Sequence, residues 1–326
     1  MAAPPNRNEI SDTYPNPTDA VARAGFGKLW DYVTGLLGAT GNAVEARAAL
    51  GVDDPMANGF RLTLTSNVPV TPTDVVGGTI YACPMTGNVI SLYDATLAKW
   101  VKRTSAQFSL ALGTLTSNLP HDVFCYSNAG VPTLEFTPWT NLVTRATALV
   151  RLDGVLVKSG APTRRYLGTF RTNGTTTTVD SDAFRYLWNY YNRVDRRILV
   201  LGLSSTWTYA TNAWRQAQGA TQNQFNCVIG VAEDITMAMV RTSALGSSGT
   251  YANCMVAMGL DSTTAPTSNT VLAATANVAY VAYNADYPVL IPEGGHYIAW
   301  LEIATSGISV TFQGGGGGAI LGTMRA

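Results

Sequence analysis

The stretch FRLTLTSNVP at residues 60–69 is where the chain changes character, because from here onward short β-type runs alternate with Gly, Pro, Asn and Asp. Its last seven residues, TLTSNVP, recur as TLTSNLP at residues 114–120. Each copy precedes an aromatic run, a glycine turn and a run of alternating polarity. We interpret the two copies as related β units in tandem, with chance identity over so short a stretch as the alternative.

The second half of the chain continues this β pattern. Runs of β-type residues recur at intervals of roughly 8 to 12 residues, a spacing typical of a sandwich or jelly roll. They include Ile198–Leu203, Phe225–Val231, Thr250–Met258, Val278–Tyr283 and Tyr297–Ile303. We therefore predict a mainly β protein with a C-terminal β-sandwich or jelly-roll-like domain.

Two segments of this half need separate interpretation. Residues 184–194 fit either a helical face or strand alternation, and their aromatic density favours a strand. At the end of the chain, we predict a hairpin that pairs Val310–Phe312 with Ala319–Leu321 across five consecutive glycines, Gly314–Gly318. Such a glycine turn is flexible unless its neighbours hold it.

The first 58 residues have a different composition. Residues 1–17 are rich in Pro and Asn and form an extended arm. A short helix with heptad-like apolar spacing follows at residues 22–36, and a second short helix is expected at residues 43–50. The first helix is marginal alone, which indicates partner helices or a docking surface. A single amphipathic helix packed on its own domain is the alternative.

Composition excludes several classes of function. The chain carries 21 basic and 21 acidic residues and no basic run, so we expect no nucleic-acid partner. The start of the sequence lacks a signal-type apolar segment, and no run is long enough to span a bilayer, so we expect no membrane insertion. A hydrophobic content of 46% with only 13% charged residues predicts apolar surface hidden between subunits. Four widely spaced cysteines are expected to be free buried thiols.

Residue patterns for catalysis or cofactor binding are weak. The two histidines, His121 and His296, lie far apart and have no nearby ligand-type residues, so neither a metal site nor a nucleophilic triad is indicated. Two carboxylate pairs, Asp180 with Asp182 and Glu233 with Asp234, could in principle cleave a glycan. Both pairs have the setting of turn acids. We therefore predict a protein that is not an enzyme and has no cofactor.

Aromatic residues of the outer half are the remaining candidates for binding. Most are expected in the core or at subunit interfaces, while a subset could stack on sugar rings. Residues 204–218 mix aromatics with Ser, Thr, Asn and Gln, as expected of a sugar-binding loop. We therefore select Trp207, Tyr209 and Trp214 as candidate receptor-binding residues.

Parts of the sequence resemble known phage proteins. EISDTYP at residues 9–15, FGKLWDYVTGLLG at 26–38 and ATGN…ARAALG at 39–51 look like the N-terminal module and short helical linker of phage tail fibres and related virion proteins. LALGTL at 110–115, DGVLVKSG at 153–160, RYLGT at 165–169 and WNYYNR at 188–193 look like a module widespread in phage virion proteins. The resemblance covers most of residues 8–200.

The resemblance implies a homotrimer whose N-terminus docks on the particle while its C-terminal domain points outward. The residues it assigns to virion anchoring are Tyr14, Phe26, Leu29, Trp30, Val33 and Leu36. We expect an anchoring segment at residues 1–58, tandem small β modules at 59–168 and a jelly-roll-like domain at 169–326. The chain lacks the extended coiled coil, collagen-like repeat or β-helix of long fibres, so a short fibre is expected.

The expected function is therefore that of a structural protein of the phage virion, a short trimeric tail fibre that acts in host recognition and adsorption. A head fibre or capsid decoration protein is the alternative, and a glycan-degrading tailspike is a minor one. Expected partners are other copies of the chain, the tail adaptor or portal or other virion proteins, and a host surface glycan. We expect the protein on the phage tail or head surface after assembly in the bacterial cytoplasm.

Overall fold

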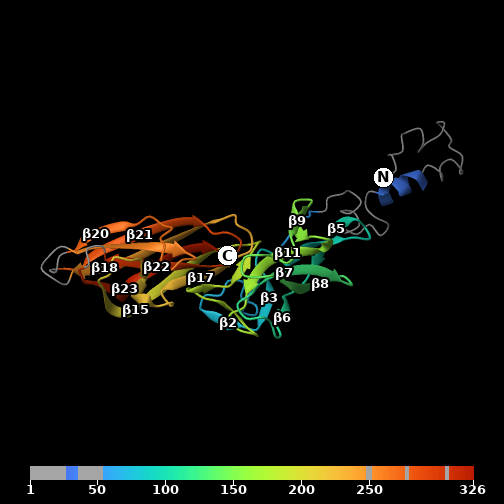
Figure 1. Cartoon of the computed structure of the whole chain (residues 1–326). Helices are drawn as coiled ribbons and strands as arrows, with labels where there is room; N and C mark the ends of the chain where they lie inside the picture. The colour runs from blue at the N-terminus through green and yellow to red at the C-terminus, as the bar shows by residue number, and fades with distance from the viewer. Residues whose placement is uncertain (1–26, 36–53, 247–251, 276–278, 305–307) are drawn as a thin grey trace, which may run out of the picture.

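The computed structural model describes residues 27–35, 54–246, 252–275, 279–304 and 308–326. Over these residues the chain is mainly β, as predicted, and helix is confined to residues 27–35 and a 3-10 turn at Ala217–Gly219. Figure 1 shows an elongated arrangement in which the helix lies apart from the strands and the last strands of the chain lie at the opposite end. None of the described helices is long and apolar enough to cross a membrane.

Three sheets make up the first β region. One has the order β1-β3-β6, one pairs β4 with β5, and one has the order β8-β7-β11-β10-β9 with β14 added to β11. Their strands are β1 (Phe60–Thr63), β3 (Thr79–Pro84), β4 (Val89–Asp94), β5 (Lys99–Thr104), β6 (Phe108–Ala111), β7 (Pro120–Asn128), β8 (Val131–Pro138), β9 (Leu149–Leu152), β10 (Val155–Lys158), β11 (Ala161–Arg171) and β14 (Leu187–Asn189).

Two further sheets make up the second β region. The eight-stranded sheet has the order β2-β12-β13-β17-β22-β19-β20 with β16 added to β22, and the four-stranded sheet has the order β15-β23-β18-β21. The first contains β2 (Val75–Gly77), β12 (Thr178–Asp180), β13 (Phe184–Arg185), β16 (Arg215–Gln216), β17 (Gln224–Ile229), β19 (Ala252–Leu260), β20 (Val271–Thr275) and β22 (Gly294–Ala304). The second contains β15 (Asp195–Tyr209), β18 (Ile235–Gly246), β21 (Val281–Leu290) and β23 (Val310–Arg325).

A shared hydrophobic core lies between these two sheets. Along β18, every second side chain is buried, because successive side chains of a strand point to opposite faces. The buried side of β18 contributes Val240, which belongs to the same core cluster as Phe225 of β17 and Trp300 of β22. Phe124 and Tyr166 of the first β region join this cluster as well. The two β regions are therefore packed into one continuous body.

Strand pairing crosses the expected domain boundaries. The boundary at residue 168 falls inside β11, and β2, at residues 75–77, pairs with β12 in the eight-stranded sheet. Near residue 58, Asn58 forms a bridge with Ile90 of β4. One strand therefore continues across the boundary at residue 168, and an isolated bridge links Asn58 to β4 at the boundary near residue 58.

The predicted C-terminal hairpin is wrong, because β23 is one continuous strand. Its first part, Val310–Gln313, pairs with Thr206–Tyr209 of β15, and its last part, Ala319–Arg325, pairs with Asp195–Leu201 of the same strand. Both parts therefore run in the same direction. The glycines between them form a bulge with a shift in register instead of a turn.

The two copies of the repeated heptapeptide share one local backbone conformation. Asn67 and Asn118, at equivalent positions, have φ angles of 60° and 61°, a left-handed conformation that Asn tolerates better than most residues. The strands that follow pair differently, since β7 pairs with β8 while β3 pairs with β1 and β6. The likeness is therefore confined to the turn.

Two further predictions are confirmed. Residues 184–194 contain β13 and β14, in agreement with the preference for a strand. The four cysteines are free and buried, namely Cys83, Cys125, Cys227 and Cys254. Burial raises the pKa of Cys125, Cys227 and Cys254 to about 12, so these thiols stay protonated at neutral pH.

Candidate functional site

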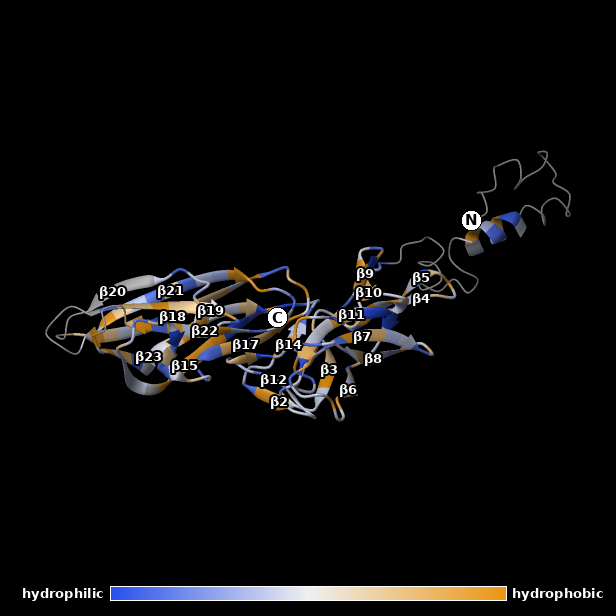
Figure 2. Ribbon diagram, viewed as in Figure 1, coloured by the Kyte–Doolittle hydropathy of each residue, from blue (hydrophilic) through white to orange (hydrophobic). Residues whose placement is uncertain are grey.

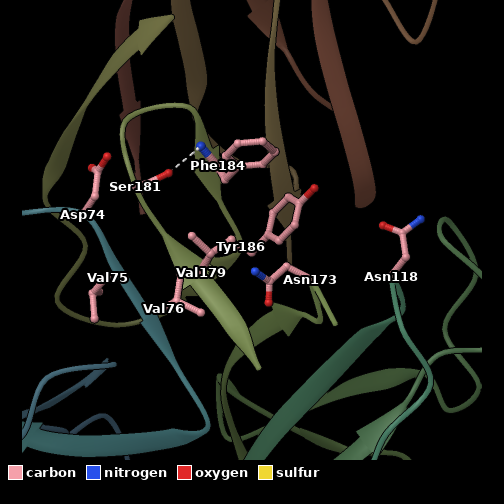
Figure 3. A pocket seen from close by; sticks show the side chains of 9 residues that line it. All are labelled: Asp74, Val75, Val76, Asn118, Asn173, Val179, Ser181, Phe184 and Tyr186. Atoms are coloured by element: carbon pink, nitrogen blue, oxygen red, sulfur yellow. Dashed lines mark hydrogen bonds between the residues drawn. The ribbon is translucent and has the colours of Figure 1, made fainter. Parts of the chain in front are cut away.

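A pocket of about 550 Å³ opens where the first β region meets the edge of the eight-stranded sheet. This volume lies within the range of roughly 300–1,000 Å³ that small-ligand sites occupy. Figure 3 shows the side chains that line it, which come from the segments around β2, β12 and β13 and from the loops before β7 and after β11. They are Asp74, Val75, Val76, Asn118, Asn173, Val179, Ser181, Phe184 and Tyr186.

Two aromatic rings stand next to each other in this pocket. The centroids of Phe184 and Tyr186 are 5.7 Å apart with an interplanar angle of 82°. Tyr186 is buried, whereas the side chain of Phe184 is 39% exposed. Burial raises the pKa of Tyr186 above its usual value of 10.0, so its hydroxyl is neutral at ordinary pH.

The amides of the pocket are oriented by neighbouring side chains. Nε of Arg171 donates to Oδ1 of Asn118 at 2.9 Å, and the same guanidinium lies 4.6 Å from the centroid of Tyr186. Oγ1 of Thr177 donates to Oδ1 of Asn173 at 2.8 Å. Both carboxamide oxygens are therefore occupied. In the described part of the chain, neither Nδ2 group of these asparagines makes a hydrogen bond, nor does the hydroxyl of Tyr186.

The turn between β12 and β13 positions Phe184. The backbone N–H of Ser181 donates to the carbonyl of Phe184 at 2.8 Å, and the N–H of Phe184 donates to Oγ of Ser181 at 3.1 Å, shown as the dashed line in Figure 3. Arg185 then bridges the two sides of the turn, because it contacts Asp180 at 2.7 Å and Asp182 at 2.9 Å.

The carboxylates of Asp180 and Asp182 belong to a network of arginines. Arg196 contacts Asp180 at 3.2 Å, and Nε of Arg197 donates to Asp182 at 2.8 Å. Burial lowers the pKa of Arg196, an effect that the charge of Asp180 opposes. Both carboxylates are therefore engaged in ion pairs with guanidinium groups of the same chain.

The second carboxylate pair has a similar environment. Arg193 contacts Glu233 at 2.9 Å and Asp234 at 2.7 Å. Arg151 lies 3.8 Å from Glu233, and Arg325 lies 3.8 Å from Asp234. Both acids therefore act in surface ion pairs that connect separate parts of the chain.

The two histidines also have structural partners. Nδ1 of His121 lies 2.9 Å from the carbonyl of Leu119, and its ring stacks on Phe170 with centroids 4.8 Å apart. Nδ1 of His296 lies 2.7 Å from Asp261. Over the described residues, no group of three His, Cys, Asp or Glu side chains is arranged to hold a metal ion.

Among the aromatics selected for receptor binding, Trp207 belongs to the core. Its side chain is only 9% exposed, its ring packs against Trp300 and Phe312, and its Nε1 donates to Glu302 at 2.6 Å. Selecting Trp207 as a receptor contact is therefore wrong for this conformation, because its faces and its polar atom are already occupied.

Tyr209 and Trp214 lie closer to the surface but outside the pocket. Arg215 covers the ring of Tyr209 at 3.7 Å, and the hydroxyl donates to the carbonyl of Ala213. Trp214 is half-buried against a small apolar cluster of β19 and β22. The structure does not bring either residue together with the pocket.

Three of the predicted anchoring residues lie on the described helix. Trp30 is 66% exposed, whereas Leu29 and Val33 are half-buried. Tyr14, Phe26 and Leu36 lie outside the described residues.

Sequence reasoning did not select the residues of the pocket. The alternation of Phe184, Tyr186 and Trp188 was visible in the sequence and placed the first two on one face of a strand. Nothing in the sequence connects these rings with Asn118, which lies 66 positions earlier and reaches the pocket only through the fold.

Comparisons with known proteins give little guidance. No protein-family model and no curated protein matches the sequence. Among solved structures, the chain is similar to the Cry4Aa toxin from Bacillus thuringiensis at 8% identity and a TM-score of 0.22, over 76% of this chain and 49% of the toxin. It therefore spans about half the length of that toxin.

Two other solved structures show equally distant similarity. A protein of the Gx strain of infectious bursal disease virus matches at 12% identity and a TM-score of 0.25, over 83% of this chain and 73% of the viral chain. A family 43 arabinoxylan arabinofuranohydrolase from Bacillus subtilis matches at 11% identity and a TM-score of 0.22, over 82% of this chain and 66% of the enzyme. Similarity at this level supports no statement about function.

Proposed function

We propose that this chain is a non-enzymatic structural protein of a tailed-bacteriophage virion, a short trimeric tail fibre that attaches through its N-terminus and acts in host recognition. The observation that carries this proposal is the separation between an N-terminal helix with an exposed tryptophan, Trp30, and a β body that offers a binding pocket. The sequence resemblance to phage virion proteins is the reason for proposing that the chain is part of a phage particle.

The helix at residues 27–35 supports attachment at the N-terminal end. Leu29, Trp30 and Val33 line one shallow apolar surface, and Figure 2 shows hydrophobic and hydrophilic residues on the same short helix. A helix of this length is unstable alone in water, so it needs a partner surface. A tail adaptor, a portal subunit or the equivalent helices of a trimer would each supply one.

The outer face of the four-stranded sheet supports a trimer. Here Leu201 and Leu203 of β15, Ile235 and Met237 of β18, and Leu290 of β21 are all exposed. Ile235 stands opposite Leu290 in the strand register, so these two apolar side chains are neighbours on β18 and β21. We call these five residues the outer apolar face. Exposed patches of this kind mark protein interfaces, and identical subunits would cover it in a trimer.

The proposal also includes a jelly-roll-like fold for the second β region. The two large sheets with their shared core form a jelly-roll-like sandwich that carries the distal part of the fibre. Recognition fits the pocket better than catalysis does, because its lining offers hydrogen-bonding groups and aromatic rings while the paired carboxylates nearby are occupied by arginines. This arrangement argues against the glycan-degrading tailspike.

Attachment is tested by deleting residues 1–53 and assembling phage particles with the shortened chain. The deletion stops there because Arg165 donates to the carbonyls of Pro55 and Met56, so these residues belong to the β body. We expect the shortened chain to fold but to be missing from purified particles. A matched Val131→Ala variant, which changes an exposed residue of β8, should incorporate normally.

Incorporation of the shortened chain at the normal level would contradict attachment through the N-terminus. Crosslinking of the full chain in intact particles separates the two structural roles. Crosslinks to portal or adaptor subunits support the tail fibre, whereas crosslinks to capsid subunits support a head fibre or decoration protein.

A further inference from the structure

The pocket around Phe184 has an apolar wall that solvent can reach. Val75, Val76 and Val179 line it together with the two aromatic rings, and both Val76 and Phe184 are exposed. An exposed ring of Phe has no polar atom that would benefit from water. Its position at a pocket wall therefore indicates a ligand with an apolar face.

The backbone that presents Phe184 is held rigidly. The hydrogen bonds between Ser181 and Phe184 close the turn, and Arg185 ties its two sides through Asp180 and Asp182. On the other side, the N–H of Asn226 in β17 donates to the carbonyl of Ala183 at 2.9 Å. A site with a fixed backbone loses little conformational entropy when a ligand binds. The carboxylates that resembled a catalytic pair thus have a role in positioning the ring.

The polar groups of the pocket suit hydroxyl groups. The Nδ2 groups of Asn118 and Asn173 are donors, the hydroxyl of Tyr186 can donate or accept, and Asp74 supplies a carboxylate acceptor. Oδ1 of Asp74 already accepts the N–H of Asp182 at 3.0 Å, which holds this carboxylate at the pocket. Donors and acceptors beside an aromatic ring match a molecule that carries hydroxyls around an apolar C–H face.

The charge of the pocket also restricts the net charge of the ligand. Asp74 is the one charged residue among the nine that line it, and the guanidinium of Arg171, which lies beside Asn118 and Tyr186, is engaged by both of them. Within this lining an anionic ligand would therefore meet a carboxylate and no cationic side chain. A neutral ligand avoids this repulsion.

From these observations we propose that the pocket binds a neutral saccharide unit, with one face of the sugar ring against Phe184 and its hydroxyls bonded to Asn118, Asn173 and Asp74. This inference rests on the proposed function in host recognition, for which it names the ligand class and the residues. It replaces Trp207, Tyr209 and Trp214 as the recognition site.

The test uses the purified full chain and a panel of neutral methyl glycosides of glucose, galactose, mannose and N-acetylglucosamine, with binding followed by saturation-transfer NMR and calorimetry. We expect at least one glycoside to bind saturably with a Kd on the order of 1 mM. Phe184→Ala should weaken that binding about tenfold or more, while Phe184→Tyr should retain it, since the ring face is kept. Tyr280→Ala, which removes an exposed aromatic residue outside the pocket, is the matched control and should change nothing.

Failure of every glycoside to bind, or equal binding by a folded Phe184→Ala variant, would overturn the saccharide site. Binding of unstructured peptides with no response to glycosides would overturn it as well. Adsorption of the full chain to host cells is measured separately. If the chain adsorbs but Phe184→Ala adsorbs equally, the pocket assignment fails and recognition stands. If glycosides bind at Phe184 but the chain does not adsorb to cells, the pocket stands and host recognition fails.

Discussion

At the scale of single residues, Glu302 shows how a buried charge is accommodated in this fold. Its carboxylate is fully buried and accepts hydrogen bonds from Nε1 of Trp207 at 2.6 Å, from Nε of Arg215 at 2.8 Å and from the N–H of Gln218 at 3.0 Å. Burial of an ionised carboxylate is costly unless such partners are present. The result is a polar centre that links β15, β16 and β22.

The pKa of Glu302 leads to a testable pH dependence. Burial raises it above the ordinary value of 4.5, although Trp207 and Arg215 oppose this effect. A raised folded-state pKa stabilises the protein below the unfolded value of 4.5, and this contribution is lost as the pH rises through the folded-state pKa. A Glu302→Gln variant has no such titration. We therefore expect the advantage of the wild type over this variant to be larger at about pH 4 than at about pH 7.

Urea unfolding of both proteins at the two pH values measures this difference directly. Taking the difference between the two proteins cancels the titration of all other groups. An advantage of the wild type that grows toward neutral pH would show that the folded-state pKa lies below 4.5, against the expected direction.

Residue type and local pattern predicted part of the site and not the rest. Asp180 and Asp182 were assigned to a turn from their neighbours in sequence, and they do flank the turn before β13. Trp207 was assigned to the surface because its neighbours are polar, yet its partner Glu302 lies 95 positions away. Contacts over such separations depend on the fold, so the sequence of one segment does not reveal them.

At the scale of elements, the glycines of β23 serve close packing rather than turn formation. A Cβ atom built on Gly318 would collide with the carbonyl oxygen of Gln313 and lie 2.7 Å from Cη2 of Trp300. Gly202 on the neighbouring strand has a similar restriction, since its Cβ would lie 2.7 Å from Cα of Gly314. The glycine run lets two strands approach each other above a buried tryptophan.

Two alanine variants of this run should differ in stability. Gly318→Ala should lower the free energy of unfolding by about 1–3 kcal/mol, because the new methyl group overpacks a site next to Trp300. At Gly316, no described atom lies within 4 Å of the Cβ position. Gly316→Ala should therefore be neutral or stabilise by up to about 1 kcal/mol through the lower entropy of the unfolded chain. Chemical denaturation measures both, and equal effects would contradict this account of the bulge.

Element type was easier to predict than element partners. Runs of β-type residues at regular spacing identified β22 and much of β17 as strands, because such residues favour a strand whatever its partner is. The hairpin at the glycine run failed for a different reason. Whether two apolar runs pair with each other or both pair with a third strand depends on β15, more than a hundred residues earlier.

At the scale of the whole molecule, the two β regions were expected as separate modules and are instead packed around a shared core. Trp188 of β14 and Phe225 of β17 belong to one cluster although they lie in different sheets. Arg165 of β11 reaches back to bond the carbonyl of Ser91 at 2.8 Å. Composition and periodicity are local properties, so they contain no information about these long-range contacts.

Trimer formation is the prediction that belongs to this scale. Sedimentation of the full chain at micromolar concentration should give about three times the monomer mass of 34.6 kDa. If identical subunits cover the outer apolar face, a Leu203→Asp, Met237→Asp variant should dissociate, because two carboxylates would become buried without partners. Val131→Asp, which places one carboxylate on a comparably exposed valine of β8, should leave the trimer intact.

These experiments test two hypotheses separately, namely that the chain forms a trimer and that the outer apolar face holds the trimer together. A wild-type chain that sediments as a monomer would contradict the trimer itself. A trimer that survives the double substitution would show that another surface holds it, and the helix at residues 27–35 is then the segment to delete. Dissociation of the double variant with retained strand content by circular dichroism would place the subunit contact on β15 and β18, because Leu203 and Met237 are exposed in the monomer and belong to none of its core clusters.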